Sequence, residues 1–398
     1  MHKCELTERG SNTTSSAHGQ AQSLRAMMEH NQLHDPLHNI PPEIVSSIFR
    51  FSGEPDSGDR ILISNTTTIL DESLRRCRWP LELSSVCARW RTIALGDPRL
   101  WTTIAMYRRG EIWTLPLELV QQRVSRCGSL PFQLSLWWDT EAQAADENFV
   151  SLIRFLCARC TRWRGLILRV PSHVNPFFKH NATHTLDLEL FHIDATDDPN
   201  LDHFWDMENT VIRPRNATFM GLATLPKSSS WSNLVNLCLR TVRVCDLLPI
   251  TSQCKNIKSL ELTFRRTRPS DMNQLPIEPL TLPHLTKLFI VFAAPLDLNF
   301  FMTFTRLPVL RYLVMFYLGD GERHFDLSIL QNAMTPCKTL RSIYFQNISF
   351  ASEDLLRLLS RFQHLKVLRF VNTAEGVATV PWLDALFNRL TTSLSDGP

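Results

Sequence analysis

The sequence predicts an α/β protein in which a small helical module precedes an irregular solenoid of short parallel strands and helices. Near the N-terminus, apolar residues recur at helical spacing in two separate stretches, 40–49 and 83–94. Beyond residue 105, an L-x-x-L-x-L unit recurs along the chain, which indicates a fold built from stacked copies. The length of 398 residues suits two domains or one extended array.

Composition favours a globular intracellular protein. Hydrophobic residues make up 44% of the chain and charged residues 20%, which is ordinary for folded domains. The longest apolar stretch, 288–296, is too short to span a bilayer, so no membrane partner is expected. Residues 1–35 are polar, lack the apolar core of a secretory signal and are expected to be disordered. The ten cysteines are scattered rather than grouped as in a small disulfide scaffold.

The charge distribution does not favour a nucleic-acid partner. The formal net charge is +3, and the arginine runs at 75–78 and 265–268 have no aromatic residues interleaved with them. Binding to single strands typically combines cations with stacking aromatic side chains. We therefore interpret these runs as solvated faces.

The first helix is predicted to begin at Pro41 and Pro42, because proline fits the first turn, where the N–H group is not needed. Glu43 lies in this first turn, where the helix dipole favours a carboxylate. The helix should end near Gly53, and the segment 54–59 has the composition of a loop. Its apolar stripe consists of Ile44, Val45, Ile48 and Phe49.

The second helix is predicted from about residue 83 as one continuous amphipathic segment. Gly96 ends it, and the turn Asp97–Pro98 leads to Leu100 and Trp101. Its stripe consists of Leu83, Val86, Cys87, Trp90, Ile93 and Ala94.

The repeat occurs in six clear copies at intervals of 23 to 30 residues. Its last two apolar residues are two positions apart, so both should face one side of a short strand that only a neighbouring copy can cover. Helical stretches at 149–156 and 355–362 lie between copies, and a last one at 383–390 could cap the array. The six copies are 234/237/239, 257/260/262, 285/288/290, 310/313/315, 340/343/345 and 365/368/370, and two weaker ones are Trp163/Leu166/Leu168 and Thr183/Leu186/Leu188.

The repeat lacks the asparagine that often follows the strand in such units, so no asparagine ladder should support the turns and irregular units are expected. The corresponding positions hold Val242, Arg265, Ala293, Leu318, Ile348 and Thr373.

The two N-terminal stripes together resemble the F-box, in the form common in fungal proteins. The resemblance lies in residues 37–49, LHNIPPEIVSSIF, and residues 80–101, PLELSSVCARWRTIALGDPRLW, where proline, cysteine and two tryptophans occur in order. The repeat unit resembles that of leucine-rich-repeat proteins. The chain departs from the compact F-box by an insert at about 52–79, which a surface loop tolerates at little entropic cost.

This resemblance implies a division of the chain and a function. Residues 1–35 form a tail, 36–105 an F-box-like module, and 106–398 a leucine-rich-repeat-like recognition domain. The module would bind a Skp-type adaptor and through it a cullin, within an SCF-type (cullin–RING) ubiquitin ligase. The repeat domain would bind an unknown target protein, so the chain is a substrate receptor and not itself an enzyme. The alternative is a repeat scaffold that no longer engages the ligase.

The resemblance also indicates which residues contact the adaptor, through helix-in-groove recognition. For most of them, packing within the module is an equal alternative; Pro41 and Pro42, at a helix start, are better contact candidates than Trp90. The candidates are Leu37, Ile40, Pro41, Pro42, Ile44, Ile48, Leu83, Val86, Cys87 and Trp90.

Two other patterns were weighed and set aside. Cys157 and Cys160, with His180 and His184, resemble zinc-ligand pairs, but their separation is long and a repeat strand lies between them. His192, followed by Asp194, Asp197 and Asp198, could pair for catalysis, but a solvated loop is the expected structure. No cofactor or metal is therefore expected.

Overall fold

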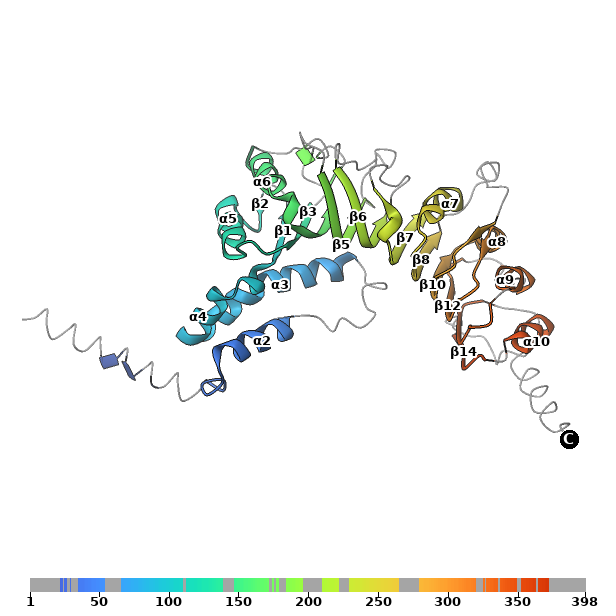
Figure 1. Ribbon diagram of the computed structural model, residues 1–398, viewed down its shortest axis with the longest axis horizontal. Coiled ribbons are helices and arrows are strands. Elements are labelled where there is room, and N and C mark those ends of the chain that lie inside the picture. Colours follow the sequence, from blue (N-terminus) through green and yellow to red (C-terminus); the bar gives the residue numbers. More distant parts are fainter. Residues whose placement is uncertain are drawn as a thin grey trace, which may run out of the picture.

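A large, mostly parallel sheet organises the protein, as its computed structural model shows (Figure 1). The structure describes residues 35–53, 66–109, 112–138, 147–171, 184–195, 210–221, 229–264, 279–319, 327–335, 337–348, 352–362 and 364–371, with minor gaps and a few isolated positions outside these ranges. The predicted final helix at 383–390, the loop at 54–59 and the arginine run at 265–268 lie outside the described residues.

The sheet contains twelve strands in the order β14-β13-β12-β10-β8-β7-β6-β5-β4-β3-β1-β2. All neighbours are parallel except the edge strand β2, which is antiparallel to β1. The strands are β1 Thr103–Arg109, β2 Ile112–Trp113, β3 Phe132–Trp138, β4 Trp163–Arg169, β5 His184–Asp194, β6 Thr210–Met220, β7 Asn236–Val242, β8 Ser259–Phe264, β10 Lys287–Phe292, β12 Tyr312–Tyr317, β13 Ser342–Gln346 and β14 Val367–Val371. The predicted α/β class is thus confirmed, and each of the six clear repeats supplies one parallel strand.

Helices between the strands cover one face of the curved sheet, its convex side in Figure 1. Parallel neighbours need a crossover connection, and these helices provide it in several of the loops. They are α5 Leu117–Arg126, α6 Glu147–Cys157, α7 Val244–Gln253, α8 Pro295–Thr303, α9 Leu327–Ala333 and α10 Ser352–Arg361. A separate two-stranded sheet pairs β9 Leu280–Thr281 with β11 Thr305–Arg306.

The register of the strands explains the repeat. Leu237, Leu260, Leu288 and Leu313 are paired across successive strands, and all are buried. The residues two positions later form a second buried row, which contains Leu239, Leu262, Ile290, Met315 and Phe345. The apolar residues of each copy therefore build one core layer between the sheet and the helices.

The weak copy at Thr183, Leu186 and Leu188 was assigned the wrong register. Leu166 and Leu168 of β4 pair with Phe191 and Ile193 of β5, so these two occupy the repeat positions. The repeat interpretation also missed β1, β3 and β6. In β6 the two repeat positions are Ala217 and Phe219, which do not match a leucine pattern.

Three helices and a short 3-10 turn lie at the β1 end of the sheet: α2 Pro42–Gly53, α3 Thr66–Val86, α4 Ala88–Gly96 and η2 Pro98–Trp101. The prediction for α2 is confirmed. The prediction of one continuous helix over 83–94 is wrong, because the chain breaks at Cys87, which has extended backbone and caps α4. The region 66–79, expected to be insert, is helical and belongs to α3.

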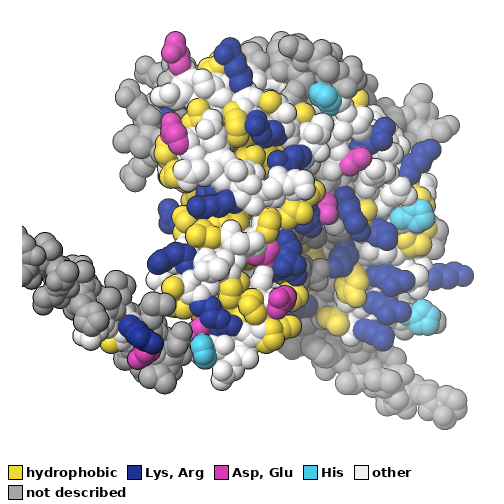
Figure 2. Space-filling view, turned by 60° about the vertical axis from the view of Figure 1, so that its left-hand side comes forward, with side chains coloured by type: hydrophobic (Ala, Val, Ile, Leu, Met, Phe, Trp, Pro, Cys, Tyr) yellow, Lys and Arg dark blue, Asp and Glu magenta, His cyan; other side chains and the backbone are white. Residues whose placement is uncertain are grey.

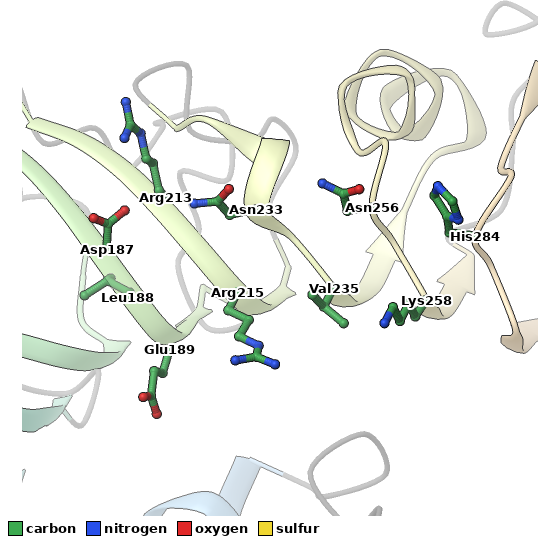
Figure 3. A pocket seen from close by; sticks show the side chains of 10 residues that line it. All are labelled: Asp187, Leu188, Glu189, Arg213, Arg215, Asn233, Val235, Asn256, Lys258 and His284. Atoms are coloured by element: carbon green, nitrogen blue, oxygen red, sulfur yellow. The ribbon is translucent and has the colours of Figure 1, made fainter.

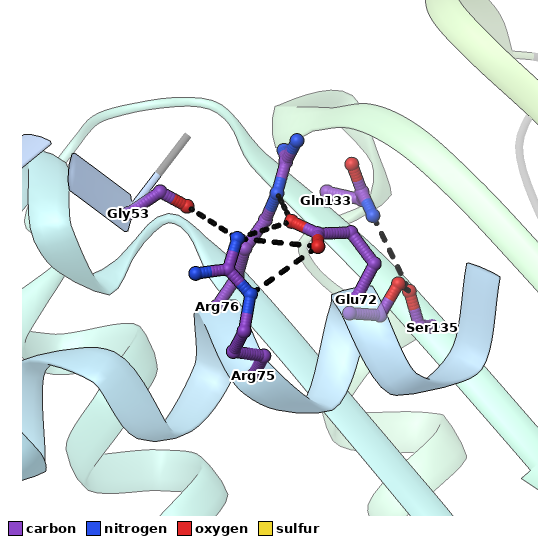
Figure 4. Close-up of polar contacts among 7 residues, drawn as sticks. Gly53, Glu72, Arg75, Arg76, Gln133 and Ser135 are labelled. Carbon is purple, nitrogen blue, oxygen red and sulfur yellow. Dashed lines mark hydrogen bonds and ion pairs between the residues drawn. The ribbon is translucent and has the colours of Figure 1, made fainter. Parts of the chain in front are cut away.

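Helix α3 packs on the face of β1 and β3 that the other helices leave open (Figures 1 and 4). Ser135 of β3 donates a hydrogen bond to Ser73 Oγ at 3.2 Å, and Cys77 Sγ lies 3.8 Å from the Ala105 carbonyl oxygen. On the outer side of α3, Glu72 accepts from both Arg75 and Arg76 (Figure 4). The predicted domain boundary at 105–106 falls within β1.

No helix in the described part of the chain combines the length and apolar character needed to cross a membrane.

Candidate functional site

Helix α2 has two apolar faces. Val45 and Phe49 are buried against the core, whereas Ile44, Ile48 and Phe51 are exposed by 52%, 39% and 66%. Positions 44, 48 and 51 follow helical spacing, so these three side chains lie along one side of the helix. We call Ile44, Ile48 and Phe51 the α2 stripe. A contiguous exposed apolar face of this kind is typical of an interaction site.

The chain that leads into α2 extends this surface. Pro41 and Pro42 are both exposed, and the Pro41 carbonyl oxygen accepts hydrogen bonds from the Ile44 and Val45 amides, each at 3.0 Å. Leu37 and Ile40 are half-buried and pack against the core. Figure 2 shows hydrophobic side chains at the surface near the start of the described chain.

The junction between α3 and α4 exposes another apolar residue. Val86, the last residue of α3, is 58% exposed, while Leu83 one turn earlier is buried. Cys87 then caps α4, with its sulfur accepting from the Trp90 amide at 3.4 Å. The break at Cys87 therefore divides the predicted stripe between two helices, with Leu83 and Val86 on α3 and Trp90 on α4.

A network around Asp35 holds the segment 35–40 against α4. The Asp35 carboxylate accepts from Trp90 Nε1 and from the Leu37 amide, each at 2.9 Å, and pairs with Arg89 at 3.2 Å. Arg89 also donates to the carbonyl oxygens of Leu37 and Ile40. Burial alone would raise the pKa of Asp35, but the hydrogen bonds from Trp90, Leu37 and Arg89 outweigh it and hold this pKa below its usual range.

A second network connects α2 to the end of α4. Ser46 of α2 donates to the buried carboxylate of Asp97, which also accepts from the Arg99 amide at 3.0 Å and from its side chain at 2.8 Å. Burial would raise the pKa of Asp97, but the hydrogen bonds from Arg99 and Ser46 lower it below its usual value. Hydrogen bonds to charged groups thus hold both the segment 35–40 and helix α2 in place beside α4.

Close packing fixes the other end of α2. Trp79 of α3 donates from Nε1 to the Phe49 carbonyl oxygen at 2.8 Å. A Cβ atom added at Gly53 would lie 2.6 Å from Trp79 Cδ1, so only glycine allows this approach. Phe49 also contacts the Trp90 ring, with 4.8 Å between ring centroids. The orientation of the α2 stripe is therefore set by packing on its opposite side.

The ten predicted contact residues thus divide into three groups. Exposed are Pro41, Pro42, Ile44, Ile48 and Val86; half-buried are Leu37, Ile40, Cys87 and Trp90; buried is Leu83. The predictions omitted Phe51, Leu81 and Leu95, which are also exposed. Phe51 continues the spacing of Ile44 and Ile48 in the sequence, and that signal could have identified it.

The open face of the sheet carries a second group of polar side chains. His192 and Asp194 lie on β5 and are buried, so the expectation of a solvated loop is wrong for both; Asp197 and Asp198 lie outside the described residues. Arg169 pairs with Asp194 at 3.9 Å, and Arg240 of β7 pairs with Glu261 of β8 at 3.2 Å. Burial lowers the pKa of His192 to about 4 and raises that of Glu261.

The zinc interpretation gains no support from the geometry. Burial raises the pKa of the Cys157 thiol to about 12, which opposes the thiolate that zinc requires. His184 is a half-buried residue of β5, and His180 lies outside the described residues. Among the residues that the structure describes, no three His, Cys, Asp or Glu side chains are grouped so as to hold a metal ion.

Comparison with known proteins adds no further assignment. No family model matches the chain, and no curated protein is significantly similar to it in sequence.

Proposed function

We propose that this chain is the substrate receptor of an SCF-type (cullin–RING) ubiquitin ligase, with an F-box-like module at the N-terminus and a leucine-rich-repeat-like solenoid after it. The module binds a Skp-type adaptor, and the adaptor connects the chain to a cullin. The solenoid binds a target protein. The chain does no bond chemistry; it raises the local concentration of a target lysine near a charged ubiquitin-transfer enzyme. Its compartment is intracellular.

The observation that carries this proposal is the α2 stripe next to exposed Pro41 and Pro42. Within the described part of the chain, these three large apolar side chains are exposed on one helix face, whereas Val45 and Phe49 on the opposite face are buried in the core. Helix-in-groove recognition uses apolar anchors at this spacing. The fungal-type F-box pattern at 37–49 contains Pro41, Pro42, Ile44 and Ile48, and Phe51 follows just after it.

The arrangement of the sheet supports the second half of the proposal. Parallel strands follow one another in chain order, with helices on one face, as expected when each repeat packs only on its neighbours. β7 has an irregular register between Arg240 and Val242, and Thr241 has a positive φ of 60°. Irregular turns of this kind agree with the absence of an asparagine ladder.

The test uses the full chain, because α3 packs on β1 and β3 and a fragment ending near residue 110 would remove β3. The variant Ile44→Asp/Ile48→Asp places two charges on the α2 stripe. We expect it to retain its melting temperature and to lose retention by a purified Skp-type adaptor by at least tenfold, because a desolvated carboxylate is costly in an apolar groove.

The matched control is Leu119→Asp/Leu296→Asp. These residues of α5 and α8 are exposed by 43% and 40%, comparable to the α2 stripe, but lie on other helices. The control should bind the adaptor normally. Equal binding by wild type and the stripe variant, or no retention of wild type at micromolar concentration, would instead favour a repeat scaffold that does not engage the ligase.

A further inference from the structure

A row of cations runs across the sheet, beginning at Arg215 within β6 and continuing at the residue just before each of β7, β8, β10, β12, β13 and β14. The backbone places these residues in line: the amide of each donates to the carbonyl oxygen of the previous one, at 2.7 to 2.9 Å. Five of the seven positions are cationic, and none is acidic. In order they are Arg215, Val235, Lys258, Thr286, Arg311, Arg341 and Lys366. We call its five cations the basic row.

The side chains of the basic row are exposed and available. Arg215, Lys258, Arg311, Arg341 and Lys366 are all exposed, and none forms a side-chain ion pair or hydrogen bond with another residue in the described ranges. Figure 3 shows Arg215, Val235 and Lys258 following one another across three neighbouring strands. In Figure 2, Lys and Arg side chains gather along the right-hand side of the view.

The neighbouring positions on the open face add positive charge and little negative charge. Lys287 lies 6.0 Å from the Tyr312 ring centre, and Arg369 lies 5.4 Å from that of Tyr344. Among the described strand residues from β7 to β14, Glu261 is the one acid, and Arg240 neutralises it at 3.2 Å. The described strands of the C-terminal half therefore carry more positive than negative charge.

A hollow of about 810 Å³ lies where the basic row begins (Figure 3). β5 and β6 extend further than their neighbours at their N-terminal ends, pairing Asp187 with Arg213, whereas β7 begins only opposite Asn216. This extension forms one wall of the hollow, and Lys258 and His284, in the segments that lead into β8 and β10, line it from the other side. Glu189 on the wall is paired with Arg164 at 2.6 Å.

We propose that the basic row is the target-binding surface and that it binds an extended peptide segment with carboxylate side chains at intervals, lying across the strands and ending in the hollow. This inference rests on the proposed function, because it names the class of target segment. Neighbouring strands are about 4.8 Å apart, so six steps span about 29 Å, or roughly nine extended residues. The cations lie one or two strands apart, which matches acidic residues at every second or third position.

The spread of the cations favours separate carboxylates over a single phosphorylated residue. A phosphate dianion is typically held by arginines that converge on one point, whereas the members of the basic row lie one or two strands apart. Single-stranded nucleic acid would need exposed aromatic faces for base stacking. The rings of Tyr312 and Tyr344 already contact Lys287 and Arg369. An acidic peptide requires only the distributed charge that the row provides.

The experiment measures fluorescence anisotropy of a labelled peptide of about twelve residues, alternating Glu and Ser, with the full chain at low salt. A peptide with Gln in place of Glu and an oligouridylate of similar length are the comparison probes. The variant Arg311→Glu/Arg341→Glu reverses the centre of the basic row. The control Arg154→Glu/Arg357→Glu makes the same change of charge on α6 and α10, at exposed positions on the helical face.

We expect the Glu peptide to bind at least tenfold more tightly than the Gln peptide, the row variant to lose at least tenfold, and the control to change by less than threefold. Equal binding of the two peptides, or equal losses in both variants, overturns the proposal. Tighter binding of oligouridylate that the row variant abolishes also overturns it, in favour of a nucleic-acid surface. Retention of the row variant by the adaptor is measured in parallel. If the adaptor still retains this variant, a failure of the peptide experiment concerns the basic row alone and not the proposed adaptor binding.

Discussion

Asp35 shows how one side chain organises the surface beside α2. It accepts from Trp90, the Leu37 amide and Arg89, and it is almost wholly enclosed, with its side chain 4% exposed. Removing one donor leaves part of a buried carboxylate without a partner, which costs more than the hydrogen bond itself contributes. Trp90 is thus a structural residue that positions Leu37 and Ile40, as well as a candidate for contact.

Replacing Trp90 with alanine should therefore lower the stability of the fold more than replacing the two prolines does. Trp90→Ala removes the ring that packs on Phe49 and the donor to Asp35, so we expect a loss of about 3 kcal/mol in stability. Pro41→Ala/Pro42→Ala should change stability by about 1 kcal/mol or less, because both prolines are exposed and mainly restrict the unfolded chain.

Thermal melting and adaptor affinity, measured on both variants, check this pair of outcomes. The proline variant should stay folded and bind the adaptor weakly. Normal adaptor binding by the proline variant would place the contact surface elsewhere. A Trp90→Ala chain that melts like wild type but fails to bind would reverse the assignment of packing and contact.

His192 is a buried histidine whose charge is opposed by its surroundings. The charged groups that bear on it are Asp194 on the same strand, its ion-pair partner Arg169 of β4, and Arg240 of β7, which pairs with Glu261 of β8. Burial is the largest cause of its low pKa of about 4, and Arg240 lowers it further while Asp194 acts in the opposite direction. The folded protein therefore keeps His192 neutral at pH values where the unfolded chain protonates it.

His192 should consequently make the folded state less stable on acidification. Between about pH 6.5 and pH 4 the unfolded state binds the extra proton, so stability is lost as pH falls, by about 2 kcal/mol at pH 5. Urea unfolding at pH 7, 6 and 5 measures this slope. His192→Gln should remove most of it, whereas Glu261, whose pKa is raised by burial, acts in the opposite direction. An unchanged slope in the variant would contradict the account.

At the scale of the element, the sequence predicted the repeat strands well because the L-x-x-L-x-L spacing recurs at each of them. It predicted α2 because Pro42 and Gly53 mark its ends. It failed at α3 and α4, where the apolar spacing continues through Cys87 although the backbone does not. A cysteine cap gives no sequence signal comparable to serine or aspartate.

The missed strands have a related cause. β6 carries Ala217 and Phe219 where other strands carry leucine-like pairs, and its first half continues beyond the repeat as the wall of the hollow. Exposure along a helix is also undetermined by sequence. Ile44 and Val45 are adjacent and chemically alike, and only the packing of α2 decides that one is exposed and the other buried.

At the scale of the whole molecule, α3 joins the two parts of the proposed function. It packs on β1 and β3 through Ser73 and Cys77 and holds α2 through Trp79. An adaptor bound on the α2 stripe and a target bound on the basic row would thus be attached to one continuous core, which includes buried residues from α2 through α10. That connection would fix the distance between ligase and target.

The most direct test of the central claim is reconstituted ubiquitin transfer. The full chain is mixed with a Skp-type adaptor, cullin–RING complex, ubiquitin and its activating and conjugating enzymes, and ubiquitin on the chain itself is measured. We predict modification of wild type and of Leu119→Asp/Leu296→Asp, dependent on the adaptor, and at least a tenfold lower rate for Ile44→Asp/Ile48→Asp. Absence of adaptor-dependent modification in wild type, or an equal rate in the stripe variant, would contradict it.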